Sequence, residues 1–289
     1  MLRDEYLLYG LDALCRAHET DYFADGHRGA AIIAAYFLCR EAELEAGAAE
    51  LIGAMIDAHW THTDLCAPFP SAVSAASAAE PALIGQVLET LEGSMDHLRQ
   101  AGHNVILPSL ALRAFEHAPE TVTPARVAGI CKLIEAFTIS EGFEPEDDDV
   151  PNLGPAPEAA EYILSELIRT TEAFTGRGQG WSGHLLTYGR ALLDLRQMGY
   201  GTLARRGERA FKRYVQRIRL GPLETDKPRP EHPPSDLDPL QRAYWQGRRY
   251  RPVGIGHVFK YPYGFYGLID LARDADLKRR CEQVAYHIF

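Results

Sequence analysis

The sequence predicts an all-α protein, and three observations lead to that prediction. Segments that alternate apolar and polar residues, as half-buried strands do, are scarce among the 289 residues. Apolar residues spaced three and four apart, as on one face of a helix, recur along most of the chain. A Gly-His pair followed by a mostly apolar run occurs four times, at nearly regular intervals. This last pattern indicates an internal helical repeat.

Five segments have the pattern of amphipathic helices, with one apolar face and one face toward water. The clearest begins with Thr123 as N-cap residue, followed by Pro124 at the first helical position and then by ARVAGICKLIEAF. We expect helices of this kind to lie on the outside of the fold. In chain order, the five segments are residues 81–98, 123–137, 158–174, 204–218 and 277–288.

The runs that follow the four Gly-His pairs are different, because they are apolar nearly all round for their first three turns. They are RGAAIIAAYFL after His27, NVILPSLALRAF after His103, LLTYGRALLDL after His184 and VFKYPYGFYGLI after His257. Helices with such sequences are buried. The intervals between the histidines are 76, 81 and 73 residues. The chain therefore has one buried helix in each repeat of about 75 residues.

Four such repeats favour an α/α barrel or toroid, in which the buried helices close around an axis and the amphipathic helices surround them. A linear solenoid, in which the repeats stack, is the alternative. We expect a single helical-repeat domain over residues 1–289, interrupted by two irregular segments. The acidic segment 141–158 and the proline-rich segment 221–239 are predicted to be loops, and the second is long enough to form a lid.

Composition and charge argue against several classes of protein. A formal net charge of −10 disfavours nucleic-acid binding, which normally requires a basic excess. No run reaches the roughly 18 apolar residues of a membrane-spanning helix, and the start MLRDEYLLYG does not have the pattern of a signal peptide. The five cysteines form no CxxC pair and are odd in number, as is typical of reduced thiols. These features predict a cytoplasmic protein with no membrane or nucleic-acid partner.

The four histidines of the Gly-His pairs are candidate metal ligands. In a barrel with parallel inner helices, equivalent positions lie at one level around the axis, so His27, His103, His184 and His257 are expected to converge. The positive end of a helix dipole disfavours imidazolium, and neutral imidazole is the form that binds a metal. A Gly-His pair can also be a simple device for entering a helix, which is the structural alternative.

Lys260 follows His257 by three residues and lies on the same helical face, within an apolar segment. A buried ammonium group must find a carboxylate, reach solvent or lose its proton. A deprotonated amine can add carbon dioxide to form a carbamate, whose anionic oxygen can bind a metal. Tyr188 and Tyr261, in the third and fourth repeats, complete the candidate catalytic residues with Lys260, because aromatic rings that line a cavity can hold a flat substrate. Packing in the core is the structural alternative for these tyrosines.

Two further motifs are weaker candidates for a functional site. His59 and His62, with Asp64 nearby, could form a metal site, but they lie at the tail of an amphipathic helix. The segment GRGQGWSGH is similar to a glycine-rich phosphate loop, but it follows a predicted helix rather than a strand. A structural role explains both more simply.

The segments GHNVILPSLALRAF, GHLLTYGRALLDL and HVFK resemble motifs of the questin oxidase-like proteins, which are helical and built from repeats. The resemblance implies a non-haem iron centre held by four histidines and a carboxylated lysine. It also implies oxidative ring opening of an aromatic polyketide, such as an anthraquinone. Transferred to this sequence, the implied ligands are His27, His103, His184, His257 and Lys260.

Ligand chemistry agrees with iron but does not select it, because imidazole binds zinc, copper, iron and nickel. Four nitrogens and one carbamate oxygen leave one octahedral position open, which suits iron better than structural zinc. We therefore expect an iron-dependent oxygenase that uses dioxygen and acts on an aromatic or polyketide-like small molecule. The alternatives are a zinc-dependent hydrolase on the same scaffold and a non-catalytic helical binding protein. A requirement for NADPH stays open, although the sequence contains no dinucleotide-binding fingerprint.

Overall fold

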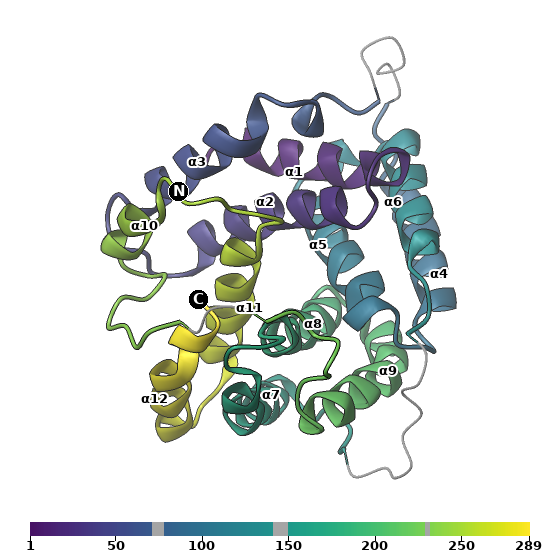
Figure 1. The fold of residues 1–289 in the computed structure, drawn as a ribbon. Coiled ribbons are helices and arrows are strands. Elements are labelled where there is room, and N and C mark those ends of the chain that lie inside the picture. Colours follow the sequence, from purple (N-terminus) through teal and green to yellow (C-terminus); the bar gives the residue numbers. More distant parts are fainter. Residues whose placement is uncertain (71–77, 141–149, 229–231) are drawn as a thin grey trace.

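The computed structural model describes residues 1–70, 78–140, 150–228 and 232–289, which form an all-α protein (Figure 1). In these segments, twelve α-helices pack against one another. The same residues contain no β-strand and only two isolated β-bridges. None of the described helices is long and apolar enough to cross a membrane. The predicted all-α fold class is confirmed.

Four helices occupy the centre of the structure, and each carries the histidine of one Gly-His pair near its start. α2 packs on α5, α5 on α8, α8 on α11, and α11 back on α2, so their contacts form a closed cycle. Runs of consecutive residues longer than a helical turn are buried in each of them, as their apolar sequences predict. These inner helices are α2 (Ala24–Glu41), α5 (His103–His117), α8 (Gly180–Gln197) and α11 (His257–Leu271).

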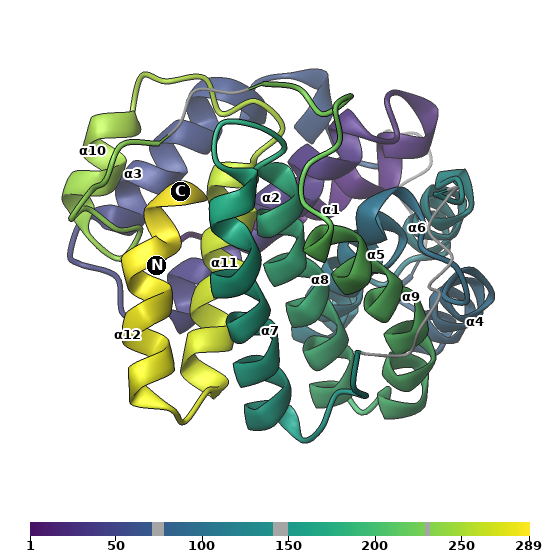
Figure 2. The ribbon, with the colours of Figure 1, turned by 60° about the horizontal axis from the view of Figure 1, so that its bottom comes forward.

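The other helices surround the inner four (Figures 1 and 2). α1 covers α2, α4 and α6 cover α5, and α7 and α9 cover α8, while α3 and the short α10 pack on each other. Their bounds are α1 (Glu5–Arg16), α3 (Ala48–Ile56), α4 (Ile84–Ser94), α6 (Pro124–Ala136), α7 (Ala156–Thr171), α9 (Gly201–Arg219), α10 (Arg242–Arg248) and α12 (Ala275–Val284). Short 3-10 or π turns lie at Ala17–Glu19, Asp57–Thr61, Asp64–Cys66, Pro81–Leu83, Gln100–Gly102, Pro119–Thr121, Glu172–Phe174 and Ala285–His287.

The two halves of the chain repeat one arrangement of helices. In the first half, the outer helix α1 packs on the inner helix α2 and on α6, which follows the second inner helix α5. In the second half, α7 packs in the same way on α8 and on α12, which follows α11. The second inner helices, α5 and α11, begin directly at their histidines and contain Pro108 and Pro262 at equivalent positions.

The first inner helices of the two halves begin earlier than expected. α2 begins three residues before His27, and α8 begins four residues before His184. The expectation that all four histidines stand at equivalent helix starts is therefore wrong for these two, whose helices continue backward through the glycine. The four Gly-His segments form two pairs, and a regular four-repeat barrel or toroid remains a prediction.

The segments predicted to be loops contain little helix where they are described. Of 141–158, residues 141–149 lie outside the described residues, and 150–155 form no helix. α7 begins at Ala156, so the last three residues of that segment are helical instead. Pro157 permits this because a proline in the first turn loses no helical hydrogen bond. Residues 221–228 and 232–239 contain no helix.

Candidate metal centre

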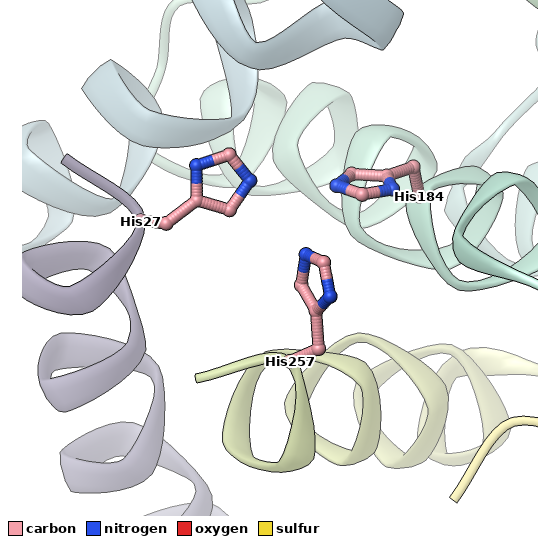
Figure 3. A group of neighbouring side chains, drawn as sticks. All are labelled: His27, His184 and His257. Atoms are coloured by element: carbon pink, nitrogen blue, oxygen red, sulfur yellow. The ribbon is translucent and has the colours of Figure 1, made fainter. Parts of the chain in front are cut away.

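Four imidazole rings from the four inner helices meet in the centre of the protein. His27, His184 and His257 point toward one another (Figure 3), and their ligand atoms all lie within 4.8 Å of one another. The ring of His103 lies beside them, with its centroid 4.3 Å from that of His27 and 4.5 Å from that of His184. The structure thus brings together the four candidate metal ligands, which we call the central histidines.

The glycines before His103 and His257 determine where α5 and α11 begin. Gly102 and Gly256 have φ angles of 88° and 84°, which side chains rarely adopt. A Cβ atom on Gly102 would lie 2.3 Å from the ring of Tyr188, and one on Gly256 would lie 2.2 Å from Cβ of Ala31. A larger residue at either position would displace the start of the helix and, with it, the histidine.

Backbone carbonyl groups fix the orientation of three of the rings. Nδ1 of each ring lies at hydrogen-bonding distance from a carbonyl oxygen in the preceding turn. Because a carbonyl oxygen only accepts hydrogen bonds, Nδ1 must carry the proton. Nε2 of the neutral ring then presents its lone pair, which can bind a metal. The pairs are His27 with Phe23 at 2.7 Å, His184 with Gly180 at 2.5 Å, and His103 with Gln100.

Burial keeps these rings neutral. The exposed fractions of His27, His103 and His184 are 0%, 2% and 8%. Desolvation is the main cause that lowers the pKa of His184 to about 3 and the pKa values of His27 and His103 well below the ordinary range. A positive charge on the nearby Lys260 would lower all three pKa values further. At neutral pH the three rings are therefore neutral, with one nitrogen protonated and the other able to donate a lone pair.

The contact between His103 and His184 favours a bound cation. Their Nε2 atoms lie 2.8 Å apart. Since both rings carry their proton on Nδ1, two lone pairs face each other, which is repulsive unless a proton or a metal ion lies between them. A proton would create an imidazolium that burial disfavours. Two nitrogens bound at right angles to one ion, each at about 2.1 Å, would be separated by about 3 Å.

Lys260 is buried beside the central histidines, one turn along α11 from His257. Its side chain is 2% exposed, and its Nζ atom has no hydrogen-bond partner among the described residues. Burial lowers the pKa of this amine well below its ordinary value. The site therefore contains an amine that has no carboxylate to stabilise its charge within the described part of the chain.

Tyr261 contacts two of the central histidines. Its ring stacks on that of His257, with centroids 4.6 Å apart and an interplanar angle of 13°. Its hydroxyl group lies 3.3 Å from Nδ1 of His184 and 3.4 Å from the carbonyl oxygen of Gly180. Tyr261 is thus placed to orient the rings of His257 and His184.

A cavity of about 690 Å³ opens beside His257 and Tyr261. Sites for small molecules typically have volumes of roughly 300–1,000 Å³. Much of the wall is aromatic or aliphatic, and part of it comes from the segment 221–239 that was predicted to form a loop or lid. That segment contributes His232, Pro233, Ser235 and Leu237.

Tyr188 packs between α9 and the start of α5. It lies one turn after His184 on α8, where it is fully buried and packs on Phe211 and Tyr214 of α9. Its ring also packs against Gly102, and it does not line the cavity beside His257. The structure assigns Tyr188 to the core, because the rotation of α8 directs this residue toward α9 rather than toward the axis.

A second polar cluster, buried or half-buried except at Glu41, lies further along the inner helices, and the sequence patterns did not predict it. Arg190 and Asp194 of α8 form an ion pair at 2.7 Å, and Tyr263 of α11 donates a hydrogen bond of 2.5 Å to Asp194. Glu41 of α2 pairs with Arg113 of α5 and, at 3.4 Å, with Arg190. The positive charges of the two arginines balance the negative charges of the two carboxylates. Together with Tyr263, these side chains link all four inner helices. Charged residues within otherwise apolar helices were the available signal.

The weaker candidate site around His59 does not form a compact group of ligands. Among the described residues, only the histidine triad of Figure 3 has three ligand atoms so close together. His62 is exposed, whereas His59 and Asp64 line a separate cavity of about 480 Å³.

Comparison with known proteins does not assign a function to these residues. No protein-family model, curated protein or solved structure matches this chain significantly. The chemistry of the centre therefore has to be inferred from the residues that converge, from their protonation and from the cavity beside them.

Proposed function

We propose that the protein is a non-haem iron-dependent oxygenase that acts on an aromatic small molecule. In this proposal the central histidines and a carboxylated Lys260 hold the metal. The observation that carries the proposal is the convergence of His27, His184 and His257, whose ligand atoms lie within 4.8 Å of one another, with the ring of His103 beside them.

The donor atoms fit a metal ion better than a purely structural role. Nε2 of His27 is buried and has no hydrogen-bond partner among the described residues. The facing lone pairs of His103 and His184 add a repulsion. Leaving a buried polar group unsatisfied costs about 1–3 kcal/mol, so a helix-entry role alone leaves a substantial cost unexplained. A single metal ion would satisfy these nitrogens together.

Lys260 fits the role of a carbamate ligand. Its neutral amine would add to carbon dioxide, forming an N–C bond and releasing one proton, and the product carries one negative charge. The compact group of ligands consists of histidines alone, so this charge would be the anionic part of the donor set. Lys260 lines neither the cavity beside His257 nor the one beside His59, which favours a ligand over a nucleophile that contacts substrate.

Iron bound here would supply a centre that activates dioxygen. The substrate would enter the cavity beside His257, where Tyr261 forms part of the wall. The stacked ring of Tyr261 holds His257 in place, and its hydroxyl group can hold or donate a proton at a substrate oxygen. The aromatic wall residues would favour a flat ring system.

Metal analysis of untagged protein tests this proposal. We expect about one iron per chain and dioxygen consumption when a hydroxyanthraquinone is supplied. His184→Ala and His257→Ala should lose the metal, whereas the matched control His59→Ala should retain it. Zinc without dioxygen consumption would instead support a hydrolase, and absence of any bound metal would overturn the proposal.

Bicarbonate tests the carbamate separately. If Lys260 is carboxylated, the iron content after reconstitution should rise with added bicarbonate, and Lys260→Arg should abolish that dependence. Equal iron content and equal bicarbonate dependence in Lys260→Arg would remove the lysine from the ligand set while leaving the histidine site in place.

A further inference from the structure

Two arginine side chains line the cavity beside His257. Arg248 at the end of α10 and Arg251 shortly after it both line the wall, and no acidic side chain does so among the described residues. Neither arginine forms an ion pair with a carboxylate in the part of the chain that the structure describes. The guanidinium group of Arg248 stands 3.7 Å from the ring centre of Tyr244.

This arrangement differs from that of three other arginines in the protein, which carries 40 acidic and 30 basic residues apart from histidine. Arg113, Arg126 and Arg190 are also shielded from solvent, and each is paired with a carboxylate. Arg248 is partly buried without such a pair, and burial, followed by the charge of Arg251, lowers its pKa. Two neighbouring like charges without an acidic side chain beside them repel each other, and a bound anion would relieve the repulsion.

The remainder of the wall indicates what kind of anion fits. Tyr244, Tyr261, Tyr286 and Phe289 contribute aromatic surface. Aromatic side chains hold flat rings by stacking or by edge contacts, and guanidinium groups bind carboxylates through two parallel hydrogen bonds. A small inorganic anion would use the arginines but leave the aromatic surface uncovered.

We infer that the cavity binds an aromatic carboxylate, with its acid group at Arg248 and Arg251 and its ring against the tyrosines near His257. The inference rests on the proposed function for the reaction after binding, but the binding itself does not require the metal. It identifies the substrate class as an aromatic acid rather than a neutral ring.

Calorimetric titration of the full-length, metal-depleted protein tests the inference. The ligands are naphthoate, the uncharged isostere naphthamide, and inorganic phosphate. We expect naphthoate to bind roughly tenfold or more tightly than naphthamide, as charge-assisted hydrogen bonds provide, and to bind more tightly than phosphate. The double variant Arg248→Gln/Arg251→Gln should lose this preference. The control Arg249→Gln removes an exposed neighbouring charge that does not line the cavity and should keep it.

Equal affinity for naphthoate and naphthamide would overturn the inference, as would a preference that survives in the double variant. Equal affinity for naphthoate and phosphate would also overturn it, because it would show a general anion site without selection for a ring. If the double variant does not fold, Arg251→Gln alone serves, because that side chain is exposed. Naphthoate preference without iron binding would refute only the oxygenase proposal, whereas iron and dioxygen consumption without the preference would refute only the aromatic-acid inference.

Discussion

The substitution Lys260→Met tests how much the buried amine destabilises the metal-free protein, separately from its proposed role in metal binding. The side chain is 2% exposed, and its Nζ atom has no hydrogen-bond partner among the described residues. Methionine has a similar length and no polar group to leave unsatisfied. Since a buried unsatisfied polar group costs about 1–3 kcal/mol, we expect the substitution to raise the free energy of unfolding of the metal-free protein by that amount.

The pH dependence of this gain depends on the direction of the pKa shift. Burial lowers the pKa of Lys260 in the folded protein, so at neutral pH the unfolded chain binds more protons than the folded one. Stability of the wild type therefore falls as pH decreases below the ordinary lysine pKa of about 10.4. The variant lacks this loss, so its advantage should be larger at mildly acidic than at alkaline pH.

Urea unfolding of metal-depleted proteins, followed by circular dichroism, measures the gain. A thermal scan should show an increase in Tm of about 2–4 °C for each kcal/mol. The same variant should bind less iron and show no response to bicarbonate. Lys132→Met, at an exposed position of α6, is the control and should change stability by less than about 0.5 kcal/mol. A destabilisation by Lys260→Met of more than about 1 kcal/mol would refute the reasoning, because it would show that the amine is well stabilised.

Three further predictions concern the same inner helices. His27→Ala should reduce metal affinity by roughly tenfold or more, while His59→Ala should not, as elemental analysis at limiting metal will show. The metal-free protein should lose stability below pH 6.5, because His184 has a pKa of about 3 when folded; urea titrations should show a loss of about 2 kcal/mol at pH 5 from this group alone, and a flat profile would contradict it. Asp194→Asn should destabilise by about 3–5 kcal/mol in thermal unfolding, because Arg190 loses its buried partner; a loss below about 1 kcal/mol would show that the pair is dispensable.

The features that sequence predicted well depend on local patterns. Apolar runs without a polar face identify buried helices, and the repeated Gly-His pairs identify the turns of those helices that carry the candidate metal ligands. These signals were sufficient for the all-α class and for the set of His27, His103, His184 and His257, which lie together in the structure.

The features that sequence missed depend on how helices are rotated against one another. Tyr188 and Tyr261 both come four residues after a central histidine, yet Tyr261 lines the cavity and Tyr188 packs on α9. Periodicity places a residue on a helical face but does not tell which neighbour covers that face. The starts of α2 and α8 were missed for a related reason, because a glycine can end a helix or continue it.

The ion-pair cluster of the inner helices connects stability to the site. Glu41, Arg113, Arg190, Asp194 and Tyr263 link the four inner helices at a point six to fourteen residues beyond the central histidines. A helix rises about 1.5 Å per residue, so a slip of one helix by a single turn would break these pairs and also move one imidazole by about 5 Å. The cluster therefore fixes the register in which the histidines meet. Because its charges balance, it does so without supplying the anionic charge that the proposed metal would require; under the proposal, that charge would come from a carboxylated Lys260 or from the substrate.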